Sequence, residues 1–330
     1  MEHNAVIVED LIKEYPKVRA VDGISFTVSS GEIFGLLGPN GAGKTTTIRM
    51  LLTLIKPTGG MASLFGIDVS KHPERVRQMA GYVPQDVSVD GELTGYENLL
   101  MYAKLYGLLG KERDERITEV LEYLDLGERA NDMVSTYSGG MMRRLEMAQA
   151  LVNRPRILFL DEPSIGLDPN AKRIIWGLIK KLREEFGTTI FLTTHDMNEA
   201  DVLCDRIGIM DRGQLVTLGE PSQLKSTVGG DILTISSQTP GTYTKVKELG
   251  YAIISQSVDG HFDLVVSNGE NLIPRLLDTL KTSGIEVEAV SLKKPTLDDV
   301  FLRYTGARIE EGETWTETRR TRRTFRRLTK

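Results

Sequence analysis

The sequence is poor in cysteine and has no long apolar run. Its one cysteine, Cys204, has no partner for an internal disulfide and no companion thiolate for a structural metal site, which fits a reducing compartment. The longest apolar stretches, such as 33–37 and 157–160, fall far short of the roughly 18 residues that a membrane-spanning helix needs. Residues 1–4 lack the basic and apolar segments that begin a secretory signal. We therefore expect no structural metal, no membrane span and a cytoplasmic location.

Aromatic residues are also scarce, at 6%. No segment recurs at a fixed period, and this excludes a tandem repeat array. With 40% hydrophobic and 26% charged residues, the composition is that of an ordinary globular chain. It excludes collagen-like, coiled-coil and largely disordered proteins. A length of 330 residues allows one catalytic domain of typical size and a second, smaller domain.

Acidic and basic residues are unevenly distributed along the chain. The net charge is −5, but the last twelve residues, 319–330, carry seven Arg or Lys and no acid, so residues 1–318 sum to −12. An acidic body argues against a general nucleic-acid-binding surface. The basic run could bind anionic lipid or RNA, although we favour the simpler interpretation of a disordered, solubilising tail.

From Ala5 to about Glu220, short apolar runs alternate with longer helical patterns. This alternation predicts an α/β domain with a mostly parallel sheet covered by helices. Polar residues follow each candidate strand at its carboxyl end, where ligands of such sheets bind. The candidate strands are residues 33–37, 157–160 and 189–193.

A helical insertion interrupts this α/β pattern. Between about 88 and 150 the apolar residues recur at helical spacing rather than in short runs. Thr94 and Glu97 open the segment in the T-x-x-E arrangement of a helix capping box. We therefore predict that residues 88–150 form a helical subdomain.

After Pro221 the pattern changes to a β-α-β-β-α-β order that resembles a small ferredoxin-like unit. The expected strands are 232–236, 251–255, 262–266 and 285–292. The expected helices between them are 243–249 and 272–282, and a helix over 296–304 follows. This domain could regulate hydrolysis, strengthen a dimer or bind a partner, but we favour core packing for the apolar face of Leu297, Val300 and Phe301. The predicted domains are thus 1–222, an α+β accessory domain over 223–308, and a basic, disordered tail over 309–330.

The strongest signal is a glycine-rich loop, which matches G-x-x-x-x-G-K-[ST] between an apolar strand and a helix. In such a loop the backbone N–H groups turn inward around phosphate oxygens, and the helix amino terminus adds a favourable field. Lys44 would reach the β- and γ-phosphates, and the Thr45 hydroxyl would bind Mg²⁺. The residues expected to hold the nucleotide phosphates are Gly38, Pro39, Asn40, Gly41, Ala42, Gly43, Lys44, Thr45 and Thr46.

Two carboxylates and a histidine follow later strands. Asp161 and Glu162 end the apolar run 157–160, and neighbouring side chains on a strand point to opposite sides, so their roles can differ. We expect Asp161 to bind Mg²⁺ opposite Thr45, and Glu162 to act as the base that polarises the attacking water. His195 follows the strand 189–193 and could bind a γ-phosphate oxygen or the same water.

Ser138, Gly139 and Gly140 precede a helix with two basic residues and form a second, weaker candidate for a phosphate cradle. Taken alone, a helix cap made of small residues is the simpler interpretation.

The order of these motifs resembles the nucleotide-binding subunit of ABC transporters. The resemblance covers about residues 5–220. It rests on Gly38–Thr45, Gln85, Ser138–Gly140, Asp161, Glu162, Ser164–Asp168 and His195. It implies that two subunits face head to tail and hold each ATP, with its Mg²⁺, between the phosphate loop of one and the Ser-Gly-Gly segment of the other. One copy of each motif then implies a homodimer in which Ser138 and Gly140 contact the γ-phosphate across the interface.

The same resemblance assigns further roles. Tyr15 would stack on the adenine, an interaction worth about 1–3 kcal/mol. Gln85 would contact Mg²⁺ or the attacking water, and Asp168 belongs to the loop that spans the dimer interface. Two positions depart from the family pattern, because Tyr137 stands for the usual Leu and Met141 for the usual Gln. Neither removes a phosphate-facing backbone group, so hydrolysis is still expected, although the contact to the partner could differ.

Three segments, 137–146, 164–169 and 295–302, narrow the resemblance to the daunorubicin/doxorubicin-resistance ATP-binding branch. Members of that branch pair with a separate membrane permease and export drugs, lipids or polysaccharides. The resemblance thus implies efflux and a location on the inner face of the membrane. The identity of the substrate is decided in the permease, a different chain.

The alternative is a non-transport ABC ATPase that acts on ribosomes or nucleic acid. Ribosome-acting relatives carry two cassettes in one chain, and DNA-repair relatives carry long coiled-coil insertions; this sequence has neither. The basic tail is the main feature in favour of this alternative. An inactive site is the poorest interpretation, because Lys44, Gln85, Asp161, Glu162 and His195 are all present.

Overall fold

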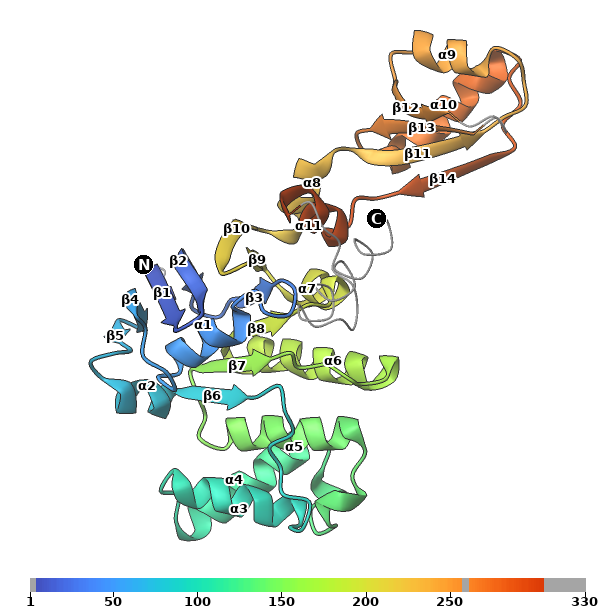
Figure 1. Ribbon diagram of the computed structural model, residues 1–330. Coiled ribbons are helices and arrows are strands. Elements are labelled where there is room, and N and C mark those ends of the chain that lie inside the picture. The colour runs from blue at the N-terminus through green and yellow to red at the C-terminus, as the bar shows by residue number, and fades with distance from the viewer. Residues whose placement is uncertain (1–3, 257–260, 306–330) are drawn as a thin grey trace, which may run out of the picture. The chain divides into compact units, whose positions relative to one another are not determined.

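The computed structural model describes residues 4–256 and 261–305, and these form two compact units (Figure 1). The first unit ends at Pro221 and the second begins at Ser222. The basic tail predicted after residue 308 lies outside the described residues. Among the described residues, no helix combines the length and apolar character needed to span a membrane.

A six-stranded sheet forms the centre of the first unit, in the order β10-β9-β3-β8-β7-β6. All neighbouring strands are parallel except β10, which runs antiparallel to β9. The strands are β3 (Ile33–Leu37), β6 (Ala80–Val83), β7 (Ile157–Asp161), β8 (Thr189–Thr194), β9 (Arg206–Asp211) and β10 (Gln214–Gly219). The predicted strands 33–37, 157–160 and 189–193 are confirmed to within one residue at each end, because uninterrupted apolar runs mark strands buried on both faces.

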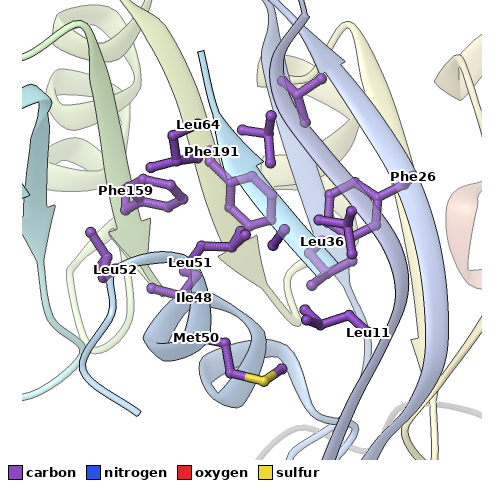
Figure 2. Close-up of a cluster of buried hydrophobic side chains, with 14 of the residues drawn as sticks. Leu11, Phe26, Leu36, Ile48, Met50, Leu51, Leu52, Leu64, Phe159 and Phe191 are labelled. Carbon is purple, nitrogen blue, oxygen red and sulfur yellow. The ribbon is translucent and has the colours of Figure 1, made fainter. Parts of the chain in front are cut away.

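A second sheet, which the sequence analysis did not predict, is antiparallel and has the order β2-β1-β4-β5. Its strands are β1 (Asn4–Tyr15), β2 (Val18–Ser29), β4 (Gly59–Leu64) and β5 (Ile67–Asp68). Phe26 of this sheet stacks on Phe34 of the parallel sheet, with ring centroids 5.2 Å apart. Figure 2 shows Ile48 and Leu51 of helix α1 (Lys44–Leu51) beside Phe159 in the same core. The helix that follows the glycine-rich loop is therefore anchored between the two sheets.

The first unit has further helices besides α1. They are α2 (Pro73–Met79), α3 (Gly95–Leu105), α4 (Gly110–Tyr123), α5 (Gly139–Leu151), α6 (Pro169–Phe186) and α7 (Met197–Leu203), with short 3-10 turns at Gly127–Arg129 and Val134–Thr136. Helices α3, α4 and α5 pack on one another, and α5 also contacts β6 (Figure 1). The capping box is confirmed: the Thr94 hydroxyl accepts from the Glu97 N–H at 3.2 Å, and the Thr94 N–H donates to Glu97 at 2.8 Å.

The second unit has a four-stranded antiparallel sheet in the order β12-β13-β11-β14. Its elements are α8 (Pro221–Val228), β11 (Asp231–Ser236), α9 (Thr242–Glu248), β12 (Ala252–Gln256), β13 (His261–Val266), α10 (Gly269–Thr282), β14 (Ala289–Lys293) and α11 (Leu297–Thr305). The predicted strand 285–292 began too early, because Ile285 and Val287 pack against this unit's core from a segment without strand pairing. Leu297, Val300 and Phe301 of α11 are buried.

Candidate functional site

The glycine-rich loop joins the carboxyl end of β3 to the start of α1 and fits closely against its surroundings. A Cβ at Gly38 would lie 2.3 Å from the Met210 carbonyl oxygen, so a side chain does not fit there. Gly43 has φ 109°, and a Cβ there would lie 2.4 Å from the Ala20 carbonyl oxygen. Glycine is required at Gly38 because of the close approach, and at Gly43 because of the close approach together with a positive φ.

Lys44 is buried, and its ammonium group lies inside the loop. Nζ donates to the carbonyl oxygens of Gly38 at 2.6 Å and Pro39 at 3.3 Å. It also forms an ion pair with Oε1 of Glu162 at 3.1 Å. The lysine of the loop is thus paired with the second carboxylate at the end of β7.

Asp161 contacts the loop through only one of its two oxygens. Oδ1 accepts from the hydroxyls of Thr45 at 3.0 Å and Thr193 at 2.5 Å. Oδ2 is buried and has no hydrogen-bond partner in the described part of the chain. Burial raises the pKa of Asp161, while its two hydrogen bonds act in the opposite direction. An unpartnered buried carboxylate oxygen next to a threonine hydroxyl suits a hard cation such as Mg²⁺.

The described residues contain no cluster of three or more His, Cys, Asp and Glu side chains that could hold a metal. A site with Asp161 and Thr45 is compatible with this finding, because Mg²⁺ is usually bound by one or two protein oxygens together with water and phosphate oxygens.

Glu162 and His195 form a second pair at the same edge of the sheet. His195 Nδ1 lies 2.7 Å from Glu162 Oε2, and the His195 backbone N–H donates to the same oxygen at 3.3 Å. Burial alone would raise the pKa of Glu162, but the hydrogen bond with His195 and the charge of Lys44 outweigh it and lower the pKa. The same hydrogen bond raises the pKa of His195 against the effect of burial.

The two neighbouring carboxylates thus have different partners: Asp161 contacts threonine hydroxyls, and Glu162 contacts Lys44 and His195. Glu162 has φ 53°, a left-handed conformation that non-glycine residues adopt at a cost of roughly 1–3 kcal/mol. Such strain is often found at functional sites, where the surrounding structure maintains it.

The Ser-Gly-Gly segment forms the start of α5 and lies beside the start of α6. The Ser138 hydroxyl accepts from the Met141 N–H at 3.3 Å and caps α5. A Cβ at Gly140 would lie 3.1 Å from Cβ of Ala171. Asp168 caps α6 by accepting from the N–H groups of Asn170 at 2.9 Å and Ala171 at 3.0 Å. No hydrogen bond or ion pair joins Ser138 or Asp168 to the glycine-rich loop among the described residues.

Gln85 and Tyr15, two further residues singled out in the sequence, form no hydrogen bond or ion pair with this cluster in the described part of the chain. Gln85 follows β6 and is exposed, without a side-chain hydrogen bond to any other described residue. Tyr15 ends β1, is 39% exposed, and has Lys13 Nζ 5.2 Å from its ring centroid.

The structure also reveals site residues that the sequence analysis did not select. Thr193, a buried residue of β8, donates to Asp161, and its backbone carbonyl accepts from the Glu162 N–H at 3.1 Å. Arg143 of α5 donates to the backbone at the end of β7. A polar residue inside the apolar strand 189–194 was the available signal for Thr193, whereas the helical pattern gives no sign that Arg143 is buried.

Comparisons with protein-family models agree with this geometry. Residues 21–165 match the model described as ABC transporter, and residues 219–305 match that of the ATP-binding protein DrrA1-3-like, C-terminal domain.

Curated relatives match nearly the whole chain. The daunorubicin resistance ATP-binding protein DrrA2 of Streptomyces coeruleorubidus is 38% identical over 95% of this chain and 98% of its own length. The linearmycin resistance ATP-binding protein LnrL of Bacillus subtilis is 37% identical over 92% and 99%. The Nod factor export ATP-binding protein I of Sinorhizobium fredii is 38% identical over 93% and 88%.

Solved structures match about two thirds of the chain. CbiO1 of Clostridium perfringens, part of an ABC transporter complex, has a TM-score of 0.64 at 27% identity, covering 68% of this chain and 92% of its own. A dimeric ATP-binding cassette in a post-hydrolysis state, bound to ADP and Pi, has a TM-score of 0.60 at 29% identity, covering 65% and 98%. On these similarities, the chain belongs to the ABC transporter ATP-binding proteins, in the branch of the daunorubicin resistance proteins, and is an ATP-hydrolysing cassette.

Proposed function

We propose that this ATPase works as a homodimer bound to a separate membrane permease, on the inner face of the membrane, and powers the export of a drug, lipid or polysaccharide. The observation that carries the proposal is the cluster of Lys44, Glu162, His195 and Asp161 at one edge of the sheet. The relatives named for daunorubicin, linearmycin and Nod factor support the direction and the cargo class.

In the proposed mechanism, ATP places its phosphates in the loop Gly38–Thr46 and attracts Lys44 away from Glu162. Glu162 then becomes free to accept a proton from the attacking water, and general-base catalysis of this kind contributes about 10²–10⁴-fold. His195 keeps Glu162 oriented and can donate to the γ-phosphate. The pairing of Glu162 with Lys44 and His195 supports this sequence of events, because both contacts lower the pKa of Glu162 and so favour its charged form.

Mg²⁺ would be held by Thr45 and Asp161, with Gln85 approaching it when ATP is bound. When bound there, the cation neutralises charge on the phosphate oxygens. The assignment is supported by Asp161 Oδ2, which is buried and has no hydrogen-bond partner within residues 4–256 and 261–305.

Ser138 and Gly140 would complete the site of a second copy of the chain. Both belong to the start of α5, which Ser138 caps. This helix start lies beside the start of α6, near Asp168, and is not hydrogen-bonded to the glycine-rich loop among the described residues. Asp168 would then lie at the interface, and Tyr15 would stack on the adenine.

The two structural units support the proposed domain division. Residues 1–222 would be the nucleotide-binding domain with the helical subdomain 88–150, and 223–308 an accessory domain. The strand order β12-β13-β11-β14, with α9 and α10 as crossovers, fits a ferredoxin-like topology. Residues 309–330 would be a tail that can touch anionic lipid.

The first experiment is the Glu162→Gln variant, which should bind ATP, hydrolyse it poorly and accumulate a dimer in size-exclusion chromatography with light scattering. Lys44→Ala is its control, because it should remain monomeric when the loop cannot hold ATP. A Glu162→Gln protein that stays monomeric at saturating ATP would refute the dimeric site.

The permease is tested by purifying tagged Glu162→Gln with ATP from detergent-solubilised native membranes and identifying its partners by mass spectrometry. A stoichiometric multi-span membrane protein is expected. Ribosomal proteins or nucleic acid in its place would favour the non-transport ATPase.

A further inference from the structure

Arg143 is a buried arginine whose five N–H donors each have an acceptor. Its side chain is 6% exposed. Nε donates to the Pro163 carbonyl at 2.8 Å, and the terminal nitrogens donate to the carbonyls of Pro84 at 2.6 Å, Asp161 at 3.4 Å and Glu162 at 2.7 Å. The remaining N–H donates to Oε2 of Glu146 at 2.9 Å. Only a guanidinium has five donors in such a fixed fork, so lysine cannot replace these contacts.

These acceptors lie at the carboxyl ends of two neighbouring strands. Pro84 follows β6, and Asp161, Glu162 and Pro163 lie at the end of β7, which pairs with β6 in parallel. Residues directly after these strand ends include both Gln85 and the proposed base. The guanidinium thus forms hydrogen bonds with both of the backbone segments that carry these two side chains.

Glu146 binds the far end of the segment 84–88, the Gln85 segment, at Ser88. Its Oε2 pairs with Arg143, and its Oε1 accepts from the Ser88 N–H at 2.6 Å and the Ser88 hydroxyl at 3.1 Å. The Glu146 side chain is 2% exposed, so the ion pair is almost completely removed from water. A buried pair of this kind requires additional hydrogen bonds to compensate its desolvation, and here the backbone provides them.

The contact with the Glu162 carbonyl falls at a strained residue. Glu162 adopts φ 53°, which directs its carboxylate toward Lys44 and His195 while its carbonyl faces Arg143. A donor at 2.7 Å from that carbonyl stabilises this backbone conformation. Without it, the carboxylate can rotate away from the position in which it meets the attacking water.

We propose that Arg143, with its charge balanced by Glu146, is a positioning residue for ATP hydrolysis, which keeps Glu162 and the Gln85 segment in a fixed mutual geometry. The proposal deepens the proposed function and rests on Glu162 acting as the base. Arg143 lies on α5, the helix that Ser138 caps, so the proposal also predicts that engagement of this helix by a nucleotide changes the position of Glu162.

The test compares Arg143→Lys and Arg143→Met with a matched control, Arg144→Met, in the full-length protein. Arg144 is the next residue on α5, but it donates to the carbonyls of Leu124 and Asp125 and to the Asp125 side chain, away from the strand ends. For both Arg143 variants, kcat for ATP should fall about tenfold to a hundredfold, the range expected for a misplaced catalytic group, while KM stays within about twofold. For Arg144→Met, both constants should remain close to wild type.

A double variant separates positioning from folding. Arg143→Met alone leaves the buried carboxylate of Glu146 without its cation, so Arg143→Met with Glu146→Met should recover the part of the melting temperature that is lost through this unpaired charge. It does not restore the N–H contacts to Pro84 and Glu162, so kcat should stay low. Recovery of kcat together with the melting temperature would overturn the proposal, as would a wild-type kcat in Arg143→Lys.

Glu162→Gln measured in parallel distinguishes the two levels of inference. If Glu162→Gln is inactive and the Arg143 variants keep full activity, only the positioning role fails. If Glu162→Gln itself hydrolyses ATP at the wild-type rate, the proposed base is wrong, and the assignment of Arg143 fails with it.

Discussion

Lys44 and Glu162 form an almost completely buried ion pair, with Nζ of Lys44 3.1 Å from Oε1 of Glu162 and both side chains 6% exposed. The residue that would bind the phosphates and the residue that would activate water are therefore each other's partners in this structure. In the proposed mechanism, the phosphates of ATP compete with Glu162 for the ammonium group of Lys44.

This competition predicts opposite effects of two substitutions on nucleotide affinity. Lys44→Ala should lose most of its affinity for ATP, since it removes the cation and leaves the carboxylate of Glu162 facing the phosphates. Glu162→Gln should bind ATP at least as tightly as wild type, because Lys44 no longer has a charged partner. Isothermal titration calorimetry measures both, and weaker binding by Glu162→Gln would contradict the competition.

A second prediction concerns pH. The pKa of His195 is raised above its ordinary value of 6.5 by Glu162, so protonated His195 stabilises the folded chain below about pH 6.5 and this contribution is lost as the pH rises through the folded-state pKa. The destabilisation caused by His195→Gln should therefore be larger at pH 6 than at pH 9 in urea denaturation of the nucleotide-free protein. In the Glu162→Gln background this pH dependence should disappear, and its persistence would assign the effect to another group.

The pKa of Glu162 has the opposite direction. Because it is lowered in the folded chain, the ionised carboxylate stabilises the protein above the ordinary value of 4.5, and this contribution is lost as the pH falls through the lowered pKa. Wild type should lose stability on acidification below about pH 4.5 more steeply than Glu162→Gln. Equal slopes in acid denaturation would show that the contacts with Lys44 and His195 do not lower the pKa of Glu162.

Removal of the divalent cation tests Asp161. With EDTA, wild type should still bind ATP through the loop but not hydrolyse it, since the charge on the phosphates is no longer neutralised. In Asp161→Asn, added Mg²⁺ should neither restore hydrolysis nor strengthen ATP binding. Thr193→Val removes a hydrogen bond to Asp161 without removing the carboxylate, so this control should retain Mg²⁺-dependent activity.

The second unit has its own core, and its stability should change independently of ATP binding. Leu264 is fully buried in that core together with Leu233 and Phe262. Leu264→Ala should destabilise this unit by about 2–5 kcal/mol, as core truncations do. Calorimetry and limited proteolysis should show the loss, with KM for ATP unchanged. A changed KM would mean that the accessory unit contributes to the nucleotide site.

The local features of this protein could be predicted from the sequence because they depend on neighbours along the chain. Loop glycines, apolar strand runs and the Thr94–Glu97 capping box have short-range signatures. The antiparallel sheet was missed, since β1 and β2 are long, half-exposed strands with irregular alternation and several register shifts. The start of β14 was misplaced because Ile285 is apolar for packing rather than for strand pairing.

The sequence by itself determined the family, the glycine-rich loop and the identity of the chemical groups at the strand ends. Only the tertiary structure decided how those groups are paired. Thr45 and Asp161 are 116 residues apart, and nothing local to either indicates that the other oxygen of Asp161 has no hydrogen-bond partner among the described residues. Likewise, the burial of Arg143 depends on two strands meeting the same helix, and such long-range packing leaves no periodic signal in the chain.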